Sequence, residues 1–253
     1  MEITPEDKLL FHEICEKVIR EERKRLGIGT LSEKTVHAVL KNYLVPKPEY
    51  HEQKCEGYVA DILYEGEIIE IQTANFNVLR RKLDAFLPKY DVTICYPIPA
   101  TKWIYWIDEE TGELSPKRKS SKKGNYYQAF KELYRIKSYL THPHLHIRLL
   151  MIDMEEYRLL NGWSKDKKKG SSRYDRIPID LIEDFQINSV ADYKALVPDT
   201  LPETFISEEY RKETKLTLNR AQTALNILTS LHILERVGKR GRSILYKRNT
   251  KFS

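Results

Sequence analysis

Two acidic side chains in the first third of the sequence are spaced so that a β-hairpin would bring them together. The runs YVADIL and EIIEIQ have strand-like apolar content and flank the short segment 64–67. If its central residues, Glu65 and Gly66, form the turn, the antiparallel ladder places Asp61 directly opposite Glu70. A four-residue loop gives the same pairing, whereas a three-residue loop does not.

This register predicts a carboxylate pair on one face of the hairpin. Side chains that are direct cross-strand neighbours have Cβ atoms about 4.5–5.5 Å apart, and like charges at such positions destabilise a sheet. Alternation along the strand places Gln72 on the same face as Glu70. The surrounding positions are apolar on both faces and indicate a buried hairpin: Val59, Ile62, Leu63, Ile68, Ile69 and Ile71.

Two neighbouring buried carboxylates are stable only if one of them takes up a proton or a cation binds between them. Oxygen ligands suit a hard divalent cation, so we predict that Asp61 and Glu70 bind Mg²⁺, with Mn²⁺ as a substitute. The alternative is that both acids reach solvent at strand ends, or that a basic side chain neutralises them.

The elements that position this pair are predicted from periodicity. An amphipathic helix over 5–26 carries Leu9, Leu10, Ile14, Val18 and Ile19, and a second helix begins at a Ser32 cap, with Glu33 in its first turn, and ends before Pro46. Helices over 76–87 and 126–140 alternate with strands over 92–96, 103–107 and 146–152. This order indicates an α/β architecture with a central mixed sheet flanked by helices.

The order of these residues and elements resembles the PD-(D/E)xK nuclease superfamily, to which restriction endonucleases belong. The resemblance covers residues 31–97: Glu33 on a helix, Asp61 ending one strand, then Glu70-Ile71-Gln72 on the next strand and a basic helix. It implies a restriction-endonuclease-like fold that hydrolyses phosphodiesters with Mg²⁺, with Asp61 and Glu70 as ligands and Glu33 as a further or water-mediated carboxylate. The whole chain also resembles a group of bacterial proteins without an assigned mechanism.

Two positions depart from the pattern of that superfamily. Ala60 stands where a proline is frequent, and Gln72 replaces the usual lysine. Glutamine can orient a water molecule but cannot act as a general base. Lys82 on the following helix is a candidate substitute cation, although Arg80, Arg81 and Lys82 together are also typical of a solvated helix face.

The C-terminal residues resemble a winged helix-turn-helix: a helix over 207–214, a turn, a helix from Leu218, and two strands around the basic turn GKRGR. Its predicted contacts to double-stranded DNA are Asn219, Arg220, Gln222, Thr223, Lys239, Arg240 and Arg242. A polar stretch before this unit is predicted to be a basic linker that adds Lys168, Lys169 and Arg173. The alternative is a winged helix that contacts protein.

We therefore predict four segments: an N-terminal helix (1–30), a nuclease-like α/β domain (31–160), a basic linker (161–185) and a winged helix (186–253). The expected function is a magnesium-dependent DNA endonuclease. The alternatives are a non-catalytic DNA-binding regulator on a degenerate nuclease fold and an RNA-processing enzyme. A homodimer is compatible with duplex DNA as the partner.

Composition agrees with a polyanionic partner, since the formal net charge is +6 and the sequence pI is about 9.0. Three dispersed cysteines give neither a disulfide framework nor a zinc ribbon, and a cytoplasmic protein without membrane contact is expected. HPHLH at 142–146 indicates a polar strand entry, with a transition-metal site as the alternative. Trp103, Tyr105 and Trp106 are predicted to pack in the sheet rather than to stack on bases.

Overall fold

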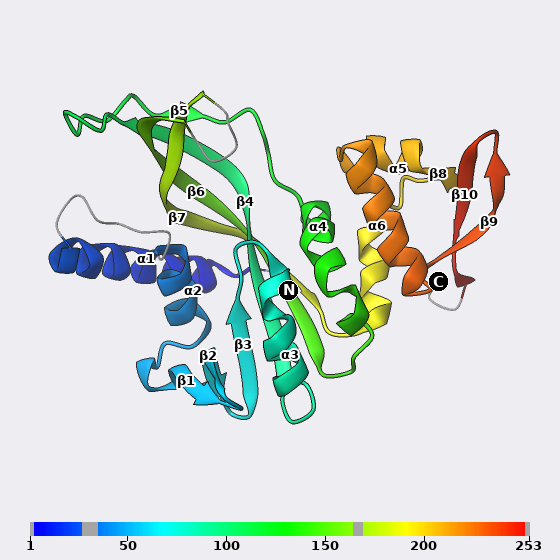
Figure 1. Cartoon of the computed structure of the whole chain (residues 1–253), viewed down its shortest axis with the longest axis horizontal. Helices are drawn as coiled ribbons and strands as arrows, with labels where there is room; N and C mark the ends of the chain where they lie inside the picture. The colour runs from blue at the N-terminus through cyan, green and yellow to red at the C-terminus, as the bar shows by residue number, and fades with distance from the viewer. Residues whose placement is uncertain (1–2, 27–34, 164–168, 251–253) are drawn as a thin grey trace. The chain divides into compact units, whose positions relative to one another are not determined.

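A large mixed sheet forms the centre of the fold in the computed structural model, which describes residues 3–26, 35–163 and 169–250. Within those residues, seven strands follow the order β1-β2-β3-β4-β6-β7, with β5 paired to β4 (Figure 1). The pairing of β2 with β3 is antiparallel and that of β3 with β4 is parallel. The strands are β1 (His51–Cys55), β2 (Tyr58–Tyr64), β3 (Glu67–Ile71), β4 (Asp91–Ile107), β5 (Arg118–Lys119), β6 (Leu145–Trp163) and β7 (Lys169–Ile187).

Helices accompany this sheet, so the predicted architecture of a mixed sheet flanked by helices is confirmed. The α-helices that precede the C-terminal residues are α1 (Pro5–Leu26), α2 (Thr35–Leu44), α3 (Arg80–Phe86) and α4 (Phe130–Leu133). Short 3-10 helices lie at η1 (Pro48–Tyr50), η2 (Phe76–Leu79), η3 (Tyr126–Ala129), η4 (Tyr134–Tyr139) and η5 (Val190–Leu196). In the described part of the chain, no helix is long and apolar enough to cross a membrane.

Contacts divide the chain into two compact units, each built from several stretches of sequence. Unit 1 comprises Met1–Gln53, Pro97–Asn125 and Leu150–Asp184, and unit 2 comprises Lys54–Tyr96, Tyr126–Leu149 and Phe185–Ser253. Strands β4, β6 and β7 contribute residues to both units. This division differs from the four consecutive segments predicted from composition, because long strands carry the chain back and forth.

In unit 1, α1 buries a stripe at helical spacing that differs from the predicted one. The buried residues are Phe11, Ile14, Cys15 and Val18. Leu9 and Leu10 are 61% and 40% exposed, so their predicted core positions are wrong. Phe11 takes the core position instead, and its ring meets that of Tyr43 on α2 edge-on, with centroids 5.2 Å apart.

The predicted linker 161–185 lies largely in strands, because β6 continues to Trp163 and β7 begins at Lys169. Its polar side chains have partners inside unit 1. Asp175 is fully buried and accepts a hydrogen bond from Thr35 Oγ1 at 2.6 Å. The Arg176 guanidinium lies 3.1 Å from the buried carboxylate of Glu156 on β6. Polarity in this segment therefore reflects charge pairing within the sheet rather than a solvated linker.

In unit 2, the hairpin of β2 and β3 turns through Glu65 and Gly66, whose φ angles are 51° and 84°. Two consecutive positive φ values are those of a type I′ turn, which matches the twist of a two-residue hairpin. Helix α3 then leads to β4, which runs parallel to β3. The helix predicted over 126–140 is divided into η3, α4 and η4, and η4 is itself kinked at Ile136, whose φ is −118°.

The C-terminal residues of unit 2 form a second, three-stranded antiparallel sheet in the order β8-β10-β9 (Figure 1). It consists of β8 (Thr204–Ile206), β9 (Leu234–Arg240) and β10 (Ser243–Arg248), and α5 (Ser207–Thr214) and α6 (Leu218–Ser230) accompany it. Helix α6 buries Ala221, Leu225 and Leu228 at helical spacing. The two helices, the turn and the two strands lie close to their predicted positions.

Candidate functional site

The hairpin has the register that was predicted from the sequence. Tyr64 pairs with Glu67 and Ile62 with Ile69, so the next position along the ladder sets Asp61 opposite Glu70. Asp61 Oδ2 accepts a hydrogen bond from the backbone N–H of Ile71 at 2.8 Å. Asp61 lies in the middle of β2 rather than at its end. The two carboxylates thus lie near each other on adjacent strands.

Burial differs between the two strands of the hairpin. Four of the five residues of β3 are buried, from Ile68 to Ile71. Val59 on β2 is 46% exposed and Asp61 is partly exposed, so the prediction of a hairpin buried on both faces is wrong for β2. The sheet therefore covers Glu70 while leaving Asp61 partly accessible.

Glu70 is the more perturbed of the two acids. Its side chain is 3% exposed. Burial raises the pKa of Glu70 to about 7, the negative charge of Asp61 contributes to this rise, and Lys82 opposes both effects. Near neutral pH this carboxyl group is therefore poised between its protonated and ionised forms.

The side chain of Lys82 on α3 reaches the carboxylates of the hairpin. This agrees with the interpretation of Lys82 as a cation of the site rather than as part of a solvated helix face. Its Nζ donates to Glu70 Oε1 at 2.9 Å and to Oε2 at 2.7 Å. Its side chain is 23% exposed. With both acids ionised, two carboxylates and one ammonium leave a net negative charge. The ammonium neutralises part of the pair, as the alternative interpretation of the two acids anticipated.

The side chain of Gln72 makes its hydrogen bond outside the cluster of Asp61, Glu70 and Lys82. Its side-chain amide donates to the carbonyl of Ala74, and its backbone N–H donates to the carbonyl of Cys95 at 3.0 Å. The amide is therefore held by the loop that follows β3. Glu33, the other predicted carboxylate, lies outside the described residues.

Asp61 and Glu70 offer carboxylate oxygens, which is the donor chemistry that Mg²⁺ prefers. Among the residues that the structure describes, no group of three or more His, Cys, Asp or Glu side chains could hold a metal ion. A cation at this pair would complete its shell with backbone, water or substrate oxygens, as is usual for Mg²⁺. Binding at Glu70 would also require the Lys82 ammonium to move away from its oxygens.

The predicted DNA contacts on α6 lie along its first turns. Asn219, Arg220 and Gln222 are exposed. Thr223 is partly buried, and its hydroxyl donates to the carbonyl of Asn219 at 3.0 Å, which leaves it less suited to a base edge. Three of the four predicted side chains on α6 therefore face solvent.

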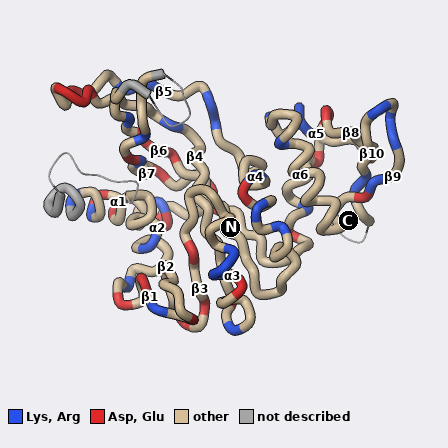
Figure 2. The backbone as a smooth tube through the Cα atoms, viewed as in Figure 1, with Lys and Arg blue, Asp and Glu red and all other residues tan. Residues whose placement is uncertain are grey.

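The strands β9 and β10 carry the predicted basic turn (Figure 2). Lys239 and Arg242 are exposed. Arg240 is engaged within its own unit, because its guanidinium donates to Glu209 Oε1 at 2.9 Å and to the Thr204 carbonyl at 3.2 Å. Arg240 thus has a structural role that the basic run alone did not indicate.

The other predicted DNA contacts belong to unit 1. Arg173 Nε lies 3.8 Å from the Glu156 carboxylate. Lys169 begins β7, but its side chain and the whole of Lys168 lie outside the described residues.

Glu156 is fully buried and is also approached by Lys102 at 3.2 Å and Arg158 at 2.5 Å. Sequence reasoning missed this cluster because its members come from three strands.

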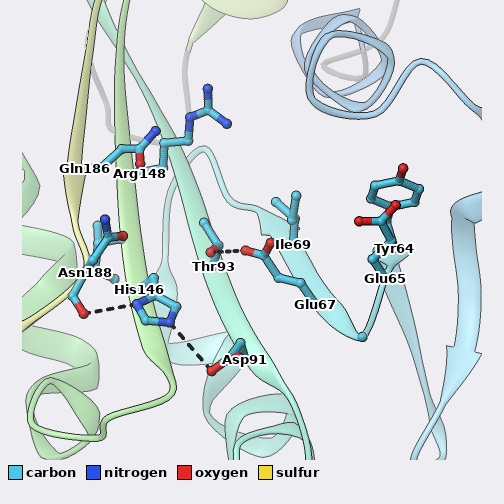
Figure 3. A pocket seen from close by; sticks show the side chains of 12 residues that line it. Tyr64, Glu65, Glu67, Ile69, Asp91, Thr93, His146, Arg148, Gln186 and Asn188 are labelled. Atoms are coloured by element: carbon cyan, nitrogen blue, oxygen red, sulfur yellow. Dashed lines mark hydrogen bonds and ion pairs between the residues drawn. The ribbon is translucent and has the colours of Figure 1, made fainter. Parts of the chain in front are cut away.

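A pocket of about 640 Å³ lies in unit 2 (Figure 3). Glu67 and Ile69 of β3 line it, so by alternation Glu70 projects to the other face of the strand. Two of its carboxylates are already paired: Thr93 donates to Glu67 at 2.5 Å, and Asp91 lies 3.7 Å from His146 Nε2. The pocket is therefore separate from the carboxylate pair.

Two of the three histidines in the HPHLH segment at 142–146 contact Asp91. His144 Nδ1 lies 2.7 Å from Asp91, and this hydrogen bond lowers the pKa of Asp91. His146 Nδ1 lies 3.2 Å from the carbonyl of Asn188. Of the three histidines only His146 is in a strand, and β6 begins at Leu145, so the segment is the polar strand entry that was predicted. The acidic partner comes from β4 and was not visible in the local sequence.

Comparisons with known proteins relate this chain to a family defined by its sequence. A family model described as Domain of unknown function (DUF8091) matches residues 34–188. A protein of Treponema pallidum (strain Nichols), called "Uncharacterized protein", is 28% identical over 236 residues, which cover 88% of each chain. No solved structure matches the chain.

Proposed function

The chain belongs to the family described as Domain of unknown function (DUF8091), and we propose that it is a magnesium-dependent endonuclease that hydrolyses DNA phosphodiesters. The observation that carries the proposal is the juxtaposition of Asp61 and Glu70, with Lys82 in contact with Glu70 at 2.7 Å. A carboxylate pair beside a lysine is suited to holding a divalent cation and a phosphate.

The surrounding elements support this proposal. An antiparallel hairpin, a helix and a strand parallel to the hairpin's second strand follow one another, in agreement with the resemblance to PD-(D/E)xK nucleases. We propose that the sheet is a restriction-endonuclease-like core. The C-terminal helices and three-stranded sheet have the element order of a winged helix-turn-helix.

Each side chain of the site has a distinct role in this proposal. Asp61 and Glu70 would hold Mg²⁺, which supplies Lewis-acid polarisation of a phosphate and acidifies an attacking water when bound. Lys82 has a long flexible side chain that can exchange its contact with Glu70 for a phosphate oxygen. The Gln72 amide neither gains nor loses a proton at ordinary pH, so it is assigned no acid or base role.

In the same proposal, the C-terminal elements position duplex DNA. The exposed Asn219, Arg220 and Gln222 on α6 offer groups that bind base edges or phosphates. Lys239 near the end of β9 and Arg242 on the turn between β9 and β10 would neutralise phosphates. Arg240 is withdrawn from the predicted contacts because Glu209 holds it.

Cleavage of supercoiled plasmid with Mg²⁺ or Mn²⁺ tests the proposal. Asp61→Asn and Glu70→Gln replace each carboxyl group with a neutral amide of nearly the same shape, and we expect each to lose nicking. Glu65→Gln is the matched control, because Glu65 is an exposed acid at the turn of the same hairpin. Nicking that survives in the Asp61 and Glu70 variants, or no nicking by the wild-type protein, would contradict the proposal.

A non-catalytic DNA-binding protein on a degenerate nuclease fold is the second candidate. Two observations favour it: the amide of Gln72 is bound to the Ala74 carbonyl, and Lys82 already neutralises Glu70. Such a protein would bind the plasmid but would not nick it in the presence of either Mg²⁺ or Mn²⁺. Its affinity would also be unchanged by Glu70→Gln.

A further inference from the structure

Three partly exposed aromatic rings line one face of the sheet in unit 1. Trp103 and Tyr105 alternate along β4 and therefore project to the same side. Tyr157 on β6 stacks on Tyr105, with ring centroids 5.0 Å apart and planes 9° apart. All three are partly accessible, whereas core aromatics such as Phe76 and Phe130 are at most 1% exposed. The sheet packing predicted for Trp103 and Tyr105 therefore leaves part of each ring open.

Two lysines, one on β5 and one directly before it, lie beside the Trp103 ring. Lys117 Nζ lies 5.1 Å from the Trp103 ring centroid, and Lys119 Nζ lies 5.6 Å from it. Residues 117–123 contain Lys117, Arg118, Lys119, Lys122 and Lys123 and no acid. Ring faces beside closely spaced cations are the combination that stacks bases and neutralises phosphates.

A carboxylate holds the parts of this surface in place. Glu155 accepts hydrogen bonds from Tyr105 Oη at 3.3 Å, from Tyr157 Oη at 3.0 Å and from Lys117 Nζ at 2.7 Å. The two rings and the ammonium are thus fixed before a ligand arrives. Ordering these groups in advance lowers the entropy cost of binding.

We propose that the surface formed by Trp103, Tyr105, Tyr157, Lys117 and Lys119 binds single-stranded DNA. A single strand is favoured over a duplex because its bases expose their faces, while those of a duplex are stacked on one another. Lys117 and Lys119 against the single carboxylate of Glu155 leave a net positive charge at the rings, which favours a polyanion. The choice of DNA over RNA rests on the proposed function, while the stacking surface itself does not.

Binding of a fluorescent dT oligomer of about 12 nucleotides by the full chain in EDTA tests the inference, since no cleavage occurs without a metal. We expect Trp103→Ala to weaken binding at least about fivefold, as loss of one stacked base does. Trp106→Ala is the matched control, because Trp106 lies on the same strand and alternation turns it to the other face. Equal affinity of the two variants would overturn the proposal.

A second pair of variants, at Lys119 and Arg118, tests the same surface if the Trp103→Ala protein does not fold. Lys119 is paired with Trp103 in the ladder and Arg118 with Ile104, so the two exposed cations project to opposite faces. Lys119→Ala should weaken binding more than Arg118→Ala. Equal losses would indicate general charge attraction and would contradict base stacking.

Two competitors separate the alternative ligands. Polyglutamate that displaces the oligomer as well as unlabelled dT does would identify an acidic-protein surface and overturn the inference. An rU oligomer that binds as tightly as dT would overturn the choice of DNA. Asp61→Asn should bind dT like the wild-type protein, so a failure of cleavage and a failure of this surface are distinguishable.

Discussion

Glu70 acquires its chemistry from its surroundings, since an exposed glutamate would titrate near pH 4.3. The pairing with Asp61 was predictable because turn chemistry and alternation fix the register of a short hairpin. The contact of Lys82 with Glu70 was one of two interpretations, because the sequence did not show whether Lys82 lies on the side of α3 that faces the sheet or on the side that faces solvent. The Glu156 cluster was not predictable, because two further strands, β4 and β7, supply three of its four cations, Lys102, Arg173 and Arg176.

Removing the cation at Glu70 should destabilise the protein. We expect Lys82→Met to lower the free energy of unfolding at pH 8 by about 1.5–3 kcal/mol, the contribution of a hydrogen bond to a charged group. Arg81→Met is the control, because Arg81 is exposed on the same helix. Urea unfolding measures both. Equal effects of the two substitutions, or an additive double mutant with Glu70→Gln, would contradict a direct ion pair.

The Glu156 cluster predicts a pH dependence of stability. Burial raises the pKa of this carboxyl group, but Arg176, Lys102 and Arg158 outweigh burial and hold it at about 2. A depressed folded-state pKa stabilises the protein above about pH 4.5, by about 3 kcal/mol, and this stabilisation is lost as pH falls toward 2. The stability gap between wild type and Glu156→Gln should therefore narrow below pH 4.5. A gap that stays constant in urea unfolding from pH 6 to 3 would contradict this assignment.

At the scale of elements, the hairpin was predicted well because local turn chemistry specifies it, and helix α6 because its apolar residues recur at helical spacing. The single helix expected over 126–140 was not, because the apolar periodicity there continues through the changes between 3-10 and α-helix and through the kink at Ile136. The polar segment 161–185 was predicted to be a linker, although its charged residues pair inside unit 1. Sequence pattern thus located the elements that are stabilised by residues nearby in sequence. It missed the polar strand segments of β6 and β7, whose charged residues pair with residues on other strands.

The turn of the hairpin can be tested separately from the chemistry. Gly66 has φ 84°, and no heavy atom lies within 4 Å of the place that an added methyl group would take, so Gly66→Ala would meet backbone strain alone. We expect a loss of about 1–2 kcal/mol, the cost of a left-handed residue with a side chain. Glu65→Asn should instead raise the melting temperature slightly, since asparagine favours this conformation. Thermal unfolding that ranks the two variants the other way would argue against the type I′ turn.

At the scale of the whole molecule, interleaving of the chain explains why domain boundaries were hard to predict. Strands β4, β6 and β7 each serve both units, so no composition change marks a border. Basic residues are also dispersed over many elements rather than gathered in one segment (Figure 2). The net charge of +6 therefore indicated a polyanionic partner without locating its contacts.

The salt dependence of duplex DNA binding, measured in EDTA, tests the phosphate contacts proposed for the C-terminal elements. Replacing Arg220, Lys239 and Arg242 with alanine should weaken binding and reduce the slope of log K against log salt by about 0.9 per lost contact. Arg240→Ala should leave the slope unchanged, because Arg240 is held by Glu209. A larger slope change for Arg240→Ala than for the triple variant would contradict the proposed interface.

The most direct test of the proposed function is the location of a divalent cation. Crystals soaked in Mn²⁺ should show an anomalous peak within coordination distance of both the Asp61 and Glu70 carboxylates, with the Lys82 ammonium displaced from Glu70. No peak at this pair, with Lys82 still bound to both oxygens of Glu70, would contradict the proposed metal-dependent nuclease.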